Sequence, residues 1–188
     1  MIGTVLGMAL LMPWSASWST LATAILPRLA AYAHASDEAS MIRTLSSSLR
    51  TALALVLPFV VLLPVVARDL SALVWGYGAA AETAGDIAPT LALMGISLIF
   101  FTTHYLVVRG FYALERTRQV FWIQCAIAAA NIVLAFALVT RASAQETTAA
   151  LAIAYTGAYA VGAALAYVLL ARRLGGLDTR RLVRFLVR

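Results

Sequence analysis

Two residues that could do chemistry lie close together in an otherwise apolar stretch, His104 and Arg109. A histidine can exchange a proton near neutral pH, and the planar guanidinium of an arginine suits a phosphate group. An ionisable group inside an apolar segment is expected to face other protein or a water-filled cavity. His104 and Arg109 are therefore candidates for the path of a polar or charged ligand.

Each candidate also has a purely structural interpretation. A neutral His104 could hydrogen-bond to a neighbouring helix, and Arg109 could anchor its segment by extending its side chain to a nearby aqueous surface. Asn131 is a third candidate for the path, and its structural alternative is a hydrogen bond between helices. The residues themselves leave both interpretations open.

The stretch RGFYALERTRQV, residues 109–120, concentrates charge between two apolar runs. Its residues Glu115, Arg116 and Arg118 are expected to form a solvated turn, with local ion pairs worth less than about 1 kcal/mol. A gate between two parts of the protein is the alternative.

Motifs for catalysis and metal binding are not found in the sequence. It contains no Gly-x-Ser-x-Gly elbow, no Walker loop and no His-Glu-x-x-His pair. The single cysteine, Cys125, excludes an intrachain disulfide, and its apolar surroundings predict a small core residue. No catalytic residue, metal site or cofactor is predicted.

The composition indicates a membrane protein. Of the 188 residues, 63% are hydrophobic and 12% are charged, whereas soluble domains average about 25% charged. The net charge of +6 comes from fourteen arginines, but these lie in the gaps between apolar segments. We therefore do not predict a nucleic-acid partner, which would need a basic face on a folded domain.

Five apolar segments approach or exceed the roughly 20 residues that a helix needs to cross a bilayer. They cover residues 2–29, 50–67, 87–108, 120–140 and 147–171. The predicted fold is an all-α, polytopic transmembrane helix bundle, because lipid cannot satisfy the backbone of other spanning structures. Residues 68–78 are interpreted as a short interfacial turn of helix that ends at Gly76 and Gly78.

Arginine-rich and arginine-poor gaps alternate along the chain. Rich gaps follow the first and third segments and the fifth, where a basic tail covers residues 172–188. The positive-inside rule then predicts an outside N-terminus and a cytoplasmic C-terminus. An N-terminus outside, with no signal peptide, is what we expect of a piece of a longer chain.

The fifth segment is rich in small residues, including Gly157 and Gly162. Small side chains let another helix approach closely. A specific packing face and a merely alanine-rich helix are both compatible with this pattern.

Several stretches, in order, resemble the MurJ/MviN lipid II flippases of the MATE-like exporter superfamily. Residues 21–63 resemble that family's eighth span, cytoplasmic helix and Pro-containing ninth span, and residues 73–101 its tenth span. RGFYALERTRQVFWIQCAIAAANIVLAFAL is similar to the Phe-Tyr-Ala step, acidic turn and Asn-bearing eleventh span. The usual Thr-Pro that closes this turn is replaced here by Arg118, Gln119 and Val120.

The resemblance implies a transporter in the bacterial cytoplasmic membrane that flips undecaprenyl-linked peptidoglycan precursor, lipid II, by alternating access. This chain would form part of one lobe of a two-lobe protein and would be inactive without an N-terminal lobe or a partner chain. Its ligands would be membrane lipid and a polyprenyl-pyrophosphate-linked substrate, whose pyrophosphate Arg109 could attract. Some relatives pair an Asn with an acid one turn later for a cation, but that position is Ala135 here.

Two alternatives remain beside this expectation. The chain could flip another polyprenyl-linked glycan, or it could be a non-transporting membrane scaffold that pairs with another chain through its small-residue helix.

Overall fold

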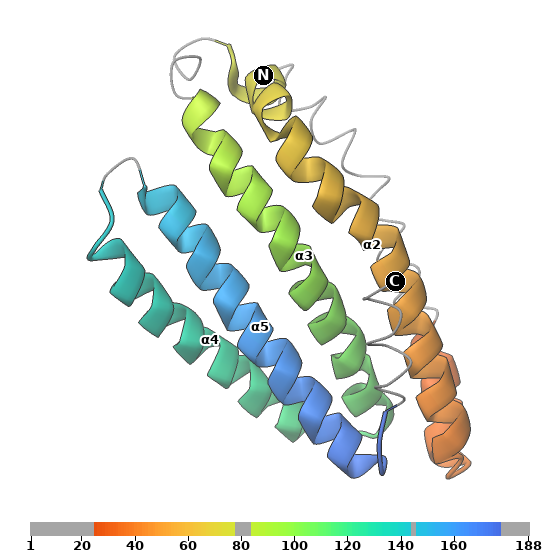
Figure 1. The fold of residues 1–188 in the computed structure, drawn as a ribbon. Coiled ribbons are helices and arrows are strands. Elements are labelled where there is room, and N and C mark those ends of the chain that lie inside the picture. The colour runs from red at the N-terminus through yellow and green to blue at the C-terminus, as the bar shows by residue number, and fades with distance from the viewer. Residues whose placement is uncertain (1–24, 78–83, 144–145, 178–188) are drawn as a thin grey trace.

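The computed structural model is a helical bundle and describes residues 25–77, 84–143 and 146–177. A short helical segment over residues 25–34 is followed by α2 (Glu38–Trp75), α3 (Ala84–Ala113), α4 (Thr117–Val139) and α5 (Thr147–Arg173). Consecutive long helices run in opposite directions (Figure 1). Within the described ranges, α2 to α5 are long and apolar enough to cross a membrane, which confirms the predicted fold class. The first predicted span, 2–29, lies almost wholly outside these ranges.

Helix α2 contains three stretches that were predicted separately from the sequence: part of the connection before residue 50, the predicted span 50–67, and most of the predicted interfacial turn 68–78. It begins after Asp37, which accepts a hydrogen bond from the Ser40 N–H at 3.0 Å, and it ends at the predicted Gly76. Hydrogen bonds from the hydroxyl and backbone of Ser40 hold the pKa of Asp37 below its usual value. Pro58 and Pro64 lie inside the helix without ending it, as spanning helices tolerate.

Helix α2 is longer than a single crossing of the membrane requires. At 1.5 Å per residue, its 38 residues cover about 57 Å, roughly twice the apolar core of a bilayer. Arg50 and Arg68 are about 27 Å apart along the helix axis. The stretch between these two arginines therefore matches the thickness of the apolar core.

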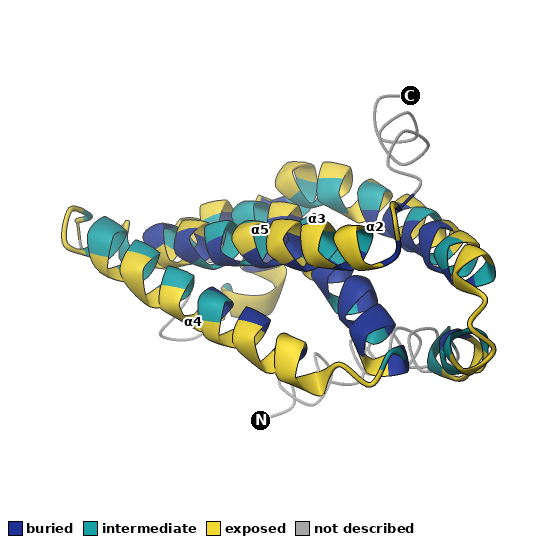
Figure 2. Ribbon diagram, turned by 90° about the horizontal axis from the view of Figure 1, so that it is seen from below, coloured by how far each residue is buried: buried dark blue, intermediate teal, exposed yellow. Residues whose placement is uncertain are grey.

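Helices α3 and α5 form the centre of the bundle, with α2 and α4 on its edges. α3 packs along both α2 and α5, whereas α4 packs mainly along α5. Figure 2 shows that much of α4 is exposed. Only Val120, Ile123 and Ile127 of this helix are buried, and Cys125 is exposed. The prediction that Cys125 is a core residue was wrong, because α4 is apolar all round and its sequence does not show which face is covered.

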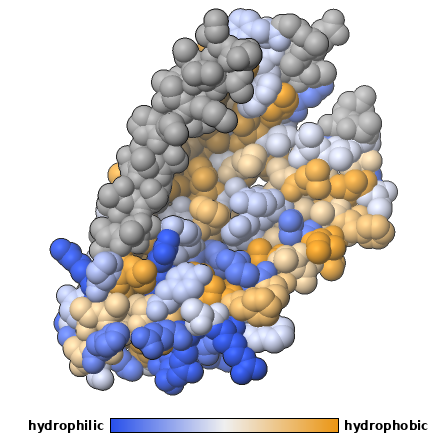
Figure 3. Space-filling model, turned by 180° about the vertical axis from the view of Figure 1, so that it is seen from behind, coloured by the Kyte–Doolittle hydropathy of each residue, from blue (hydrophilic) through white to orange (hydrophobic). Residues whose placement is uncertain are grey.

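The arginine-rich connections gather at one end of the bundle. The start of α2, the α3–α4 turn and the end of α5 lie together there (Figure 1), and hydrophilic side chains collect at the same end (Figure 3). Beneath them, Leu45, Phe111 and Leu170 are fully buried in the largest apolar cluster. The arginine-rich gaps of the sequence thus lie at one common end of the described bundle.

Small residues of α5 form a packing face rather than being scattered around the helix. Every fourth residue on one side of α5 is buried: Ala150, Ala154, Ala158, Gly162, Ala166 and Leu170. This spacing places the six residues on a single ridge. The structure thus favours the specific packing face over the merely alanine-rich helix.

Glycines on these helices lie opposite large aliphatic side chains of the neighbouring helix. A Cβ added to Gly162 would lie 2.4 Å from Cδ1 and Cγ1 of Ile127 on α4. A Cβ added to Gly110 of α3 would lie 2.7 Å from Leu170 Cδ2 on α5. The α4–α5 and α3–α5 contacts both depend on the missing side chain of a glycine.

Replacing Gly162 by alanine tests this dependence. The added methyl group forces Ile127 to move, so Gly162→Ala is expected to lower the free energy of unfolding by about 1–3 kcal/mol. Thermal unfolding of the purified chain in detergent micelles measures the effect.

Gly85 provides the matched control, because a Cβ there would meet nothing within 4 Å. Gly85→Ala should leave the unfolding temperature unchanged or raise it. Adding Ile127→Val to Gly162→Ala removes the closest methyl group and should restore part of the loss. Equal unfolding temperatures for Gly162→Ala and the unchanged chain would contradict the close contact.

Candidate functional site

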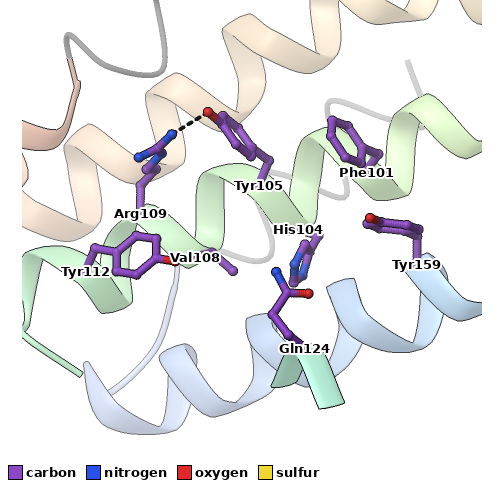
Figure 4. Close-up of a pocket in the computed structure, with 8 residues that line it drawn as sticks. All are labelled: Phe101, His104, Tyr105, Val108, Arg109, Tyr112, Gln124 and Tyr159. Atoms are coloured by element: carbon purple, nitrogen blue, oxygen red, sulfur yellow. Dashed lines mark hydrogen bonds between the residues drawn. The ribbon is translucent and has the colours of Figure 1, made fainter. Parts of the chain in front are cut away.

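One face of α3 carries a stripe of aromatic and polar residues at helical spacing. The stripe comprises Phe101, His104, Tyr105, Val108, Arg109 and Tyr112. Residues three and four apart lie on the same side of a helix, so the six side chains share one broad face of α3. Figure 4 shows them along the green helix.

This stripe forms one wall of a pocket of about 220 Å³. Gln124 of α4 and Tyr159 of α5 complete the lining (Figure 4). Because α3 packs along α5 but only lightly against α4, space is left between the three helices. The pocket is smaller than the roughly 300–1,000 Å³ that enclose a drug-sized ligand, so it suits one part of a large molecule.

Arg109 lies about one turn before α3 ends at Ala113. Its side chain is half-buried. One guanidinium nitrogen donates a hydrogen bond to the hydroxyl of Tyr105 (Figure 4), and its Cζ lies 4.6 Å from the centre of the Tyr105 ring. In the described ranges no carboxylate pairs with Arg109. Its charge and its remaining N–H groups are therefore available to an anion.

His104 is buried in the pocket wall, with 3% of its surface exposed. Its ring lies edge-on to Tyr159, with 5.8 Å between the ring centres. The backbone of Gly162 is near, but neither ring nitrogen meets hydrogen-bond geometry with any described residue. Gly162 of α5 is thus the nearest candidate for the predicted hydrogen bond to a neighbouring helix, and that bond stays a prediction.

Asn131 does not line the pocket. It lies on α4 seven residues beyond Gln124, and therefore about 10 Å farther along the same side of that helix. It is half-buried. The structure therefore brings together two of the three residues proposed for the path, His104 and Arg109, and the role of all three stays a prediction.

The charged residues Glu115, Arg116 and Arg118 are all exposed at the α3–α4 turn. No ion pair joins them within the described ranges, so the expected local pairs are absent. The turn is held instead by its backbone: the N–H of Arg116 donates to the carbonyl of Phe111 at 2.9 Å, and that of Glu115 to Tyr112 at 3.0 Å. These two bonds form a Schellman motif.

Gln124 and Tyr159 were not identified from the sequence. Gln124 belongs to α4, the next helix along the chain, and Tyr159 belongs to α5; a single polar or aromatic residue in an apolar helix gives no signal of which face it occupies. The α3 stripe did carry a signal, because its residues recur at intervals of three and four. Only His104 and Arg109 were selected from it.

Four helices able to span a membrane, with a polar pocket between three of them, define a multi-pass helical membrane protein. A family model described as lipid II flippase MurJ matches residues 9–188. The chain belongs to this family, which confirms the resemblance seen in the sequence; the family consists of membrane transporters of peptidoglycan biosynthesis rather than enzymes. Searches of curated proteins and of solved structures gave no match.

The α3–α4 turn generates a prediction about stability. Glu115 has a φ of 57°, a left-handed conformation that costs a non-glycine residue about 1 kcal/mol. Glu115→Gly is therefore expected to raise the free energy of unfolding by up to about 1 kcal/mol, as measured by thermal unfolding in micelles.

A substitution to glycine at an ordinary helical position should instead lower the free energy of unfolding. Ala128 is exposed in the middle of α4, and Ala128→Gly is expected to cost about 1 kcal/mol. A loss of stability in both variants would show that the left-handed conformation is not what limits this turn.

Proposed function

We propose that the chain is part of a transporter that flips undecaprenyl-linked lipid II, and that the pocket between α3, α4 and α5 lies on the path of this substrate. The observation that carries the proposal is Arg109. It is a half-buried cation within an apolar helix, it lines the pocket, and no described carboxylate neutralises it. A half-buried cation that lines a pocket between spanning helices is a candidate for a ligand path.

The chemistry of Arg109 suits the pyrophosphate of a polyprenyl-linked substrate. A guanidinium offers several N–H groups in a plane and binds phosphate oxygens through pairs of hydrogen bonds. Tyr105 holds one of these groups, which limits the motion of the side chain before a ligand arrives. Lysine would supply the charge without this geometry.

The membrane orientation is part of the same proposal. The arginine-rich end of the bundle would face the cytoplasm according to the positive-inside rule, in the cytoplasmic membrane of a bacterium, with the N-terminus outside and the C-terminus inside. Arg109 lies near this end. It would then meet the substrate in the leaflet where lipid II is made.

Alternating access needs a second lobe opposite the pocket. We propose that the chain supplies part of one lobe of a MATE-like transporter, and that an N-terminal lobe or a partner chain supplies the other. In this arrangement the described helices alone bind substrate without completing its transport.

Substitution of Arg109 in the intact gene product tests the proposed function. In cells depleted of their own flippase, Arg109→Ala is expected to reduce the exposure of lipid II on the outer leaflet about tenfold, because charge-assisted hydrogen bonds are lost. Arg109→Lys should retain part of the activity.

Arg172→Ala is the control, because it removes an exposed arginine from the last turn of α5 and should leave transport unchanged. Equal transport by Arg109→Ala and Arg172→Ala, at equal amounts of protein in the membrane, would refute the role of Arg109. If the intact protein exposes a different polyprenyl-linked glycan and no lipid II, the substrate assignment is wrong.

A further inference from the structure

His104 is the most unusual polar group among the described residues. It is almost fully buried, and both of its ring nitrogens are closed off from water without meeting hydrogen-bond geometry with any described residue. A neutral imidazole has one N–H donor and one acceptor. Leaving both unpaired costs free energy that packing alone does not return. Such a group is expected to find its partner in a ligand or in another state of the protein.

The surroundings of His104 indicate what kind of ligand could supply that partner. The rings of Phe101 and Tyr105 are nearly parallel, with 13° between their planes and 6.0 Å between their centres. The ring of Tyr159 lies 5.3 Å from that of Phe101. Aromatic faces are electron-rich and attract the polarised C–H groups of a compact ring. The wall thus combines apolar ring faces with a polar group that can both donate and accept.

The position of Arg109 indicates a second chemical group of the ligand. It follows Tyr105 by one turn of α3 and lines the same pocket. Passing along the helix, a ligand meets aromatic rings and an imidazole first and then a guanidinium (Figure 4). A ligand that fits this order has a hydroxyl- or amide-bearing ring next to an anionic group, as a sugar joined to a phosphate does.

We propose that this pocket binds the sugar attached to the pyrophosphate of the lipid-linked substrate, with His104 hydrogen-bonding a sugar hydroxyl or amide and Arg109 the adjoining phosphate. The inference rests on the proposed function and adds the part of the substrate that this pocket selects. The volume of about 220 Å³ suits a single ring rather than the whole headgroup. The selected feature is the sugar, since the tail and the pyrophosphate are common to all such lipids.

Gln124 adds a second polar side chain on the α4 side of the same pocket (Figure 4). It is exposed, and its side-chain amide offers two N–H donors and an acceptor oxygen. It can therefore hydrogen-bond the same sugar ring from the α4 side.

Two probes separate the sugar from the rest of the substrate: lipid II, and undecaprenyl pyrophosphate, which lacks the sugars. The intact protein is purified in micelles, and native mass spectrometry measures the dissociation constant of each probe. The unchanged protein is expected to bind lipid II more tightly than undecaprenyl pyrophosphate. His104→Phe keeps the ring but removes both nitrogens, and it should weaken lipid II binding about tenfold while leaving the other probe unchanged.

Further variants keep the experiment decisive. His104→Gln retains a donor and an acceptor and should preserve most of the preference for lipid II. Thr103→Val changes the adjacent residue, which is not part of the pocket lining, and should change neither constant. Thermal unfolding of each variant checks that it is folded. If His104→Phe does not fold, His104→Gln is compared with Gln124→Ala instead. Gln124→Ala should then weaken the binding of lipid II and leave the binding of undecaprenyl pyrophosphate unchanged.

The failure of this inference is distinguishable from the failure of the proposed function. Arg109→Ala should weaken the binding of both probes, because both carry pyrophosphate. If it changes the binding of neither probe, only the contact of Arg109 with pyrophosphate is refuted. If His104→Phe weakens the binding of both probes equally, or of neither, the sugar site is refuted while the proposed transport function stands. Equal binding of the two probes by the unchanged protein would also refute it.

Discussion

The close approach of α5 to its two neighbours is the contact on which the rest of this bundle depends. In a membrane, apolar side chains gain little by leaving lipid, so helices associate through tight van der Waals packing. The ridge of small residues from Ala150 to Leu170 provides that packing, and the absent side chain of Gly162 admits Ile127 of α4. The same glycine lies next to His104. One small residue therefore permits the helix contact and shapes the wall of the pocket.

Polar groups are concentrated where the bundle can accommodate them. The pocket gathers His104, Arg109 and Gln124 between the helices, where a polar group avoids the cost of facing lipid. At the arginine-rich end, three helices finish in left-handed residues, Ser36, Glu115 and Gly175. Helix C-termini carry partial negative charge, and arginines such as Arg172 and Arg173 in the last turn of α5 complement it. Charge is thus kept at the end and hydrogen-bonding capacity in the interior.

Helix α2 and Cys125 show where reasoning from the sequence reached its limit. Hydropathy separated a span from its flanking stretches, but the helix continues through Pro58 and Pro64, although proline has no backbone N–H to donate. A bilayer sets the length of an apolar segment and not the length of the helix that contains it. Cys125 was misplaced for a related reason, because hydropathy cannot distinguish a lipid-facing side from a protein-facing side when both are apolar.

Composition and spacing by themselves determined that this protein is a helical membrane protein, which gaps are rich in arginine, and which family it resembles. These properties depend on single segments and their order, so they can be read along the chain. Only the tertiary structure decided that the ridge of α5 is a packing face, that the ring nitrogens of His104 meet hydrogen-bond geometry with no described residue, and that Gln124 and Tyr159 join the α3 stripe while Asn131 does not. Those outcomes depend on how each helix is rotated about its axis. In uniformly apolar helices that rotation is set by side-chain contacts between helices, which the pattern along one segment does not contain.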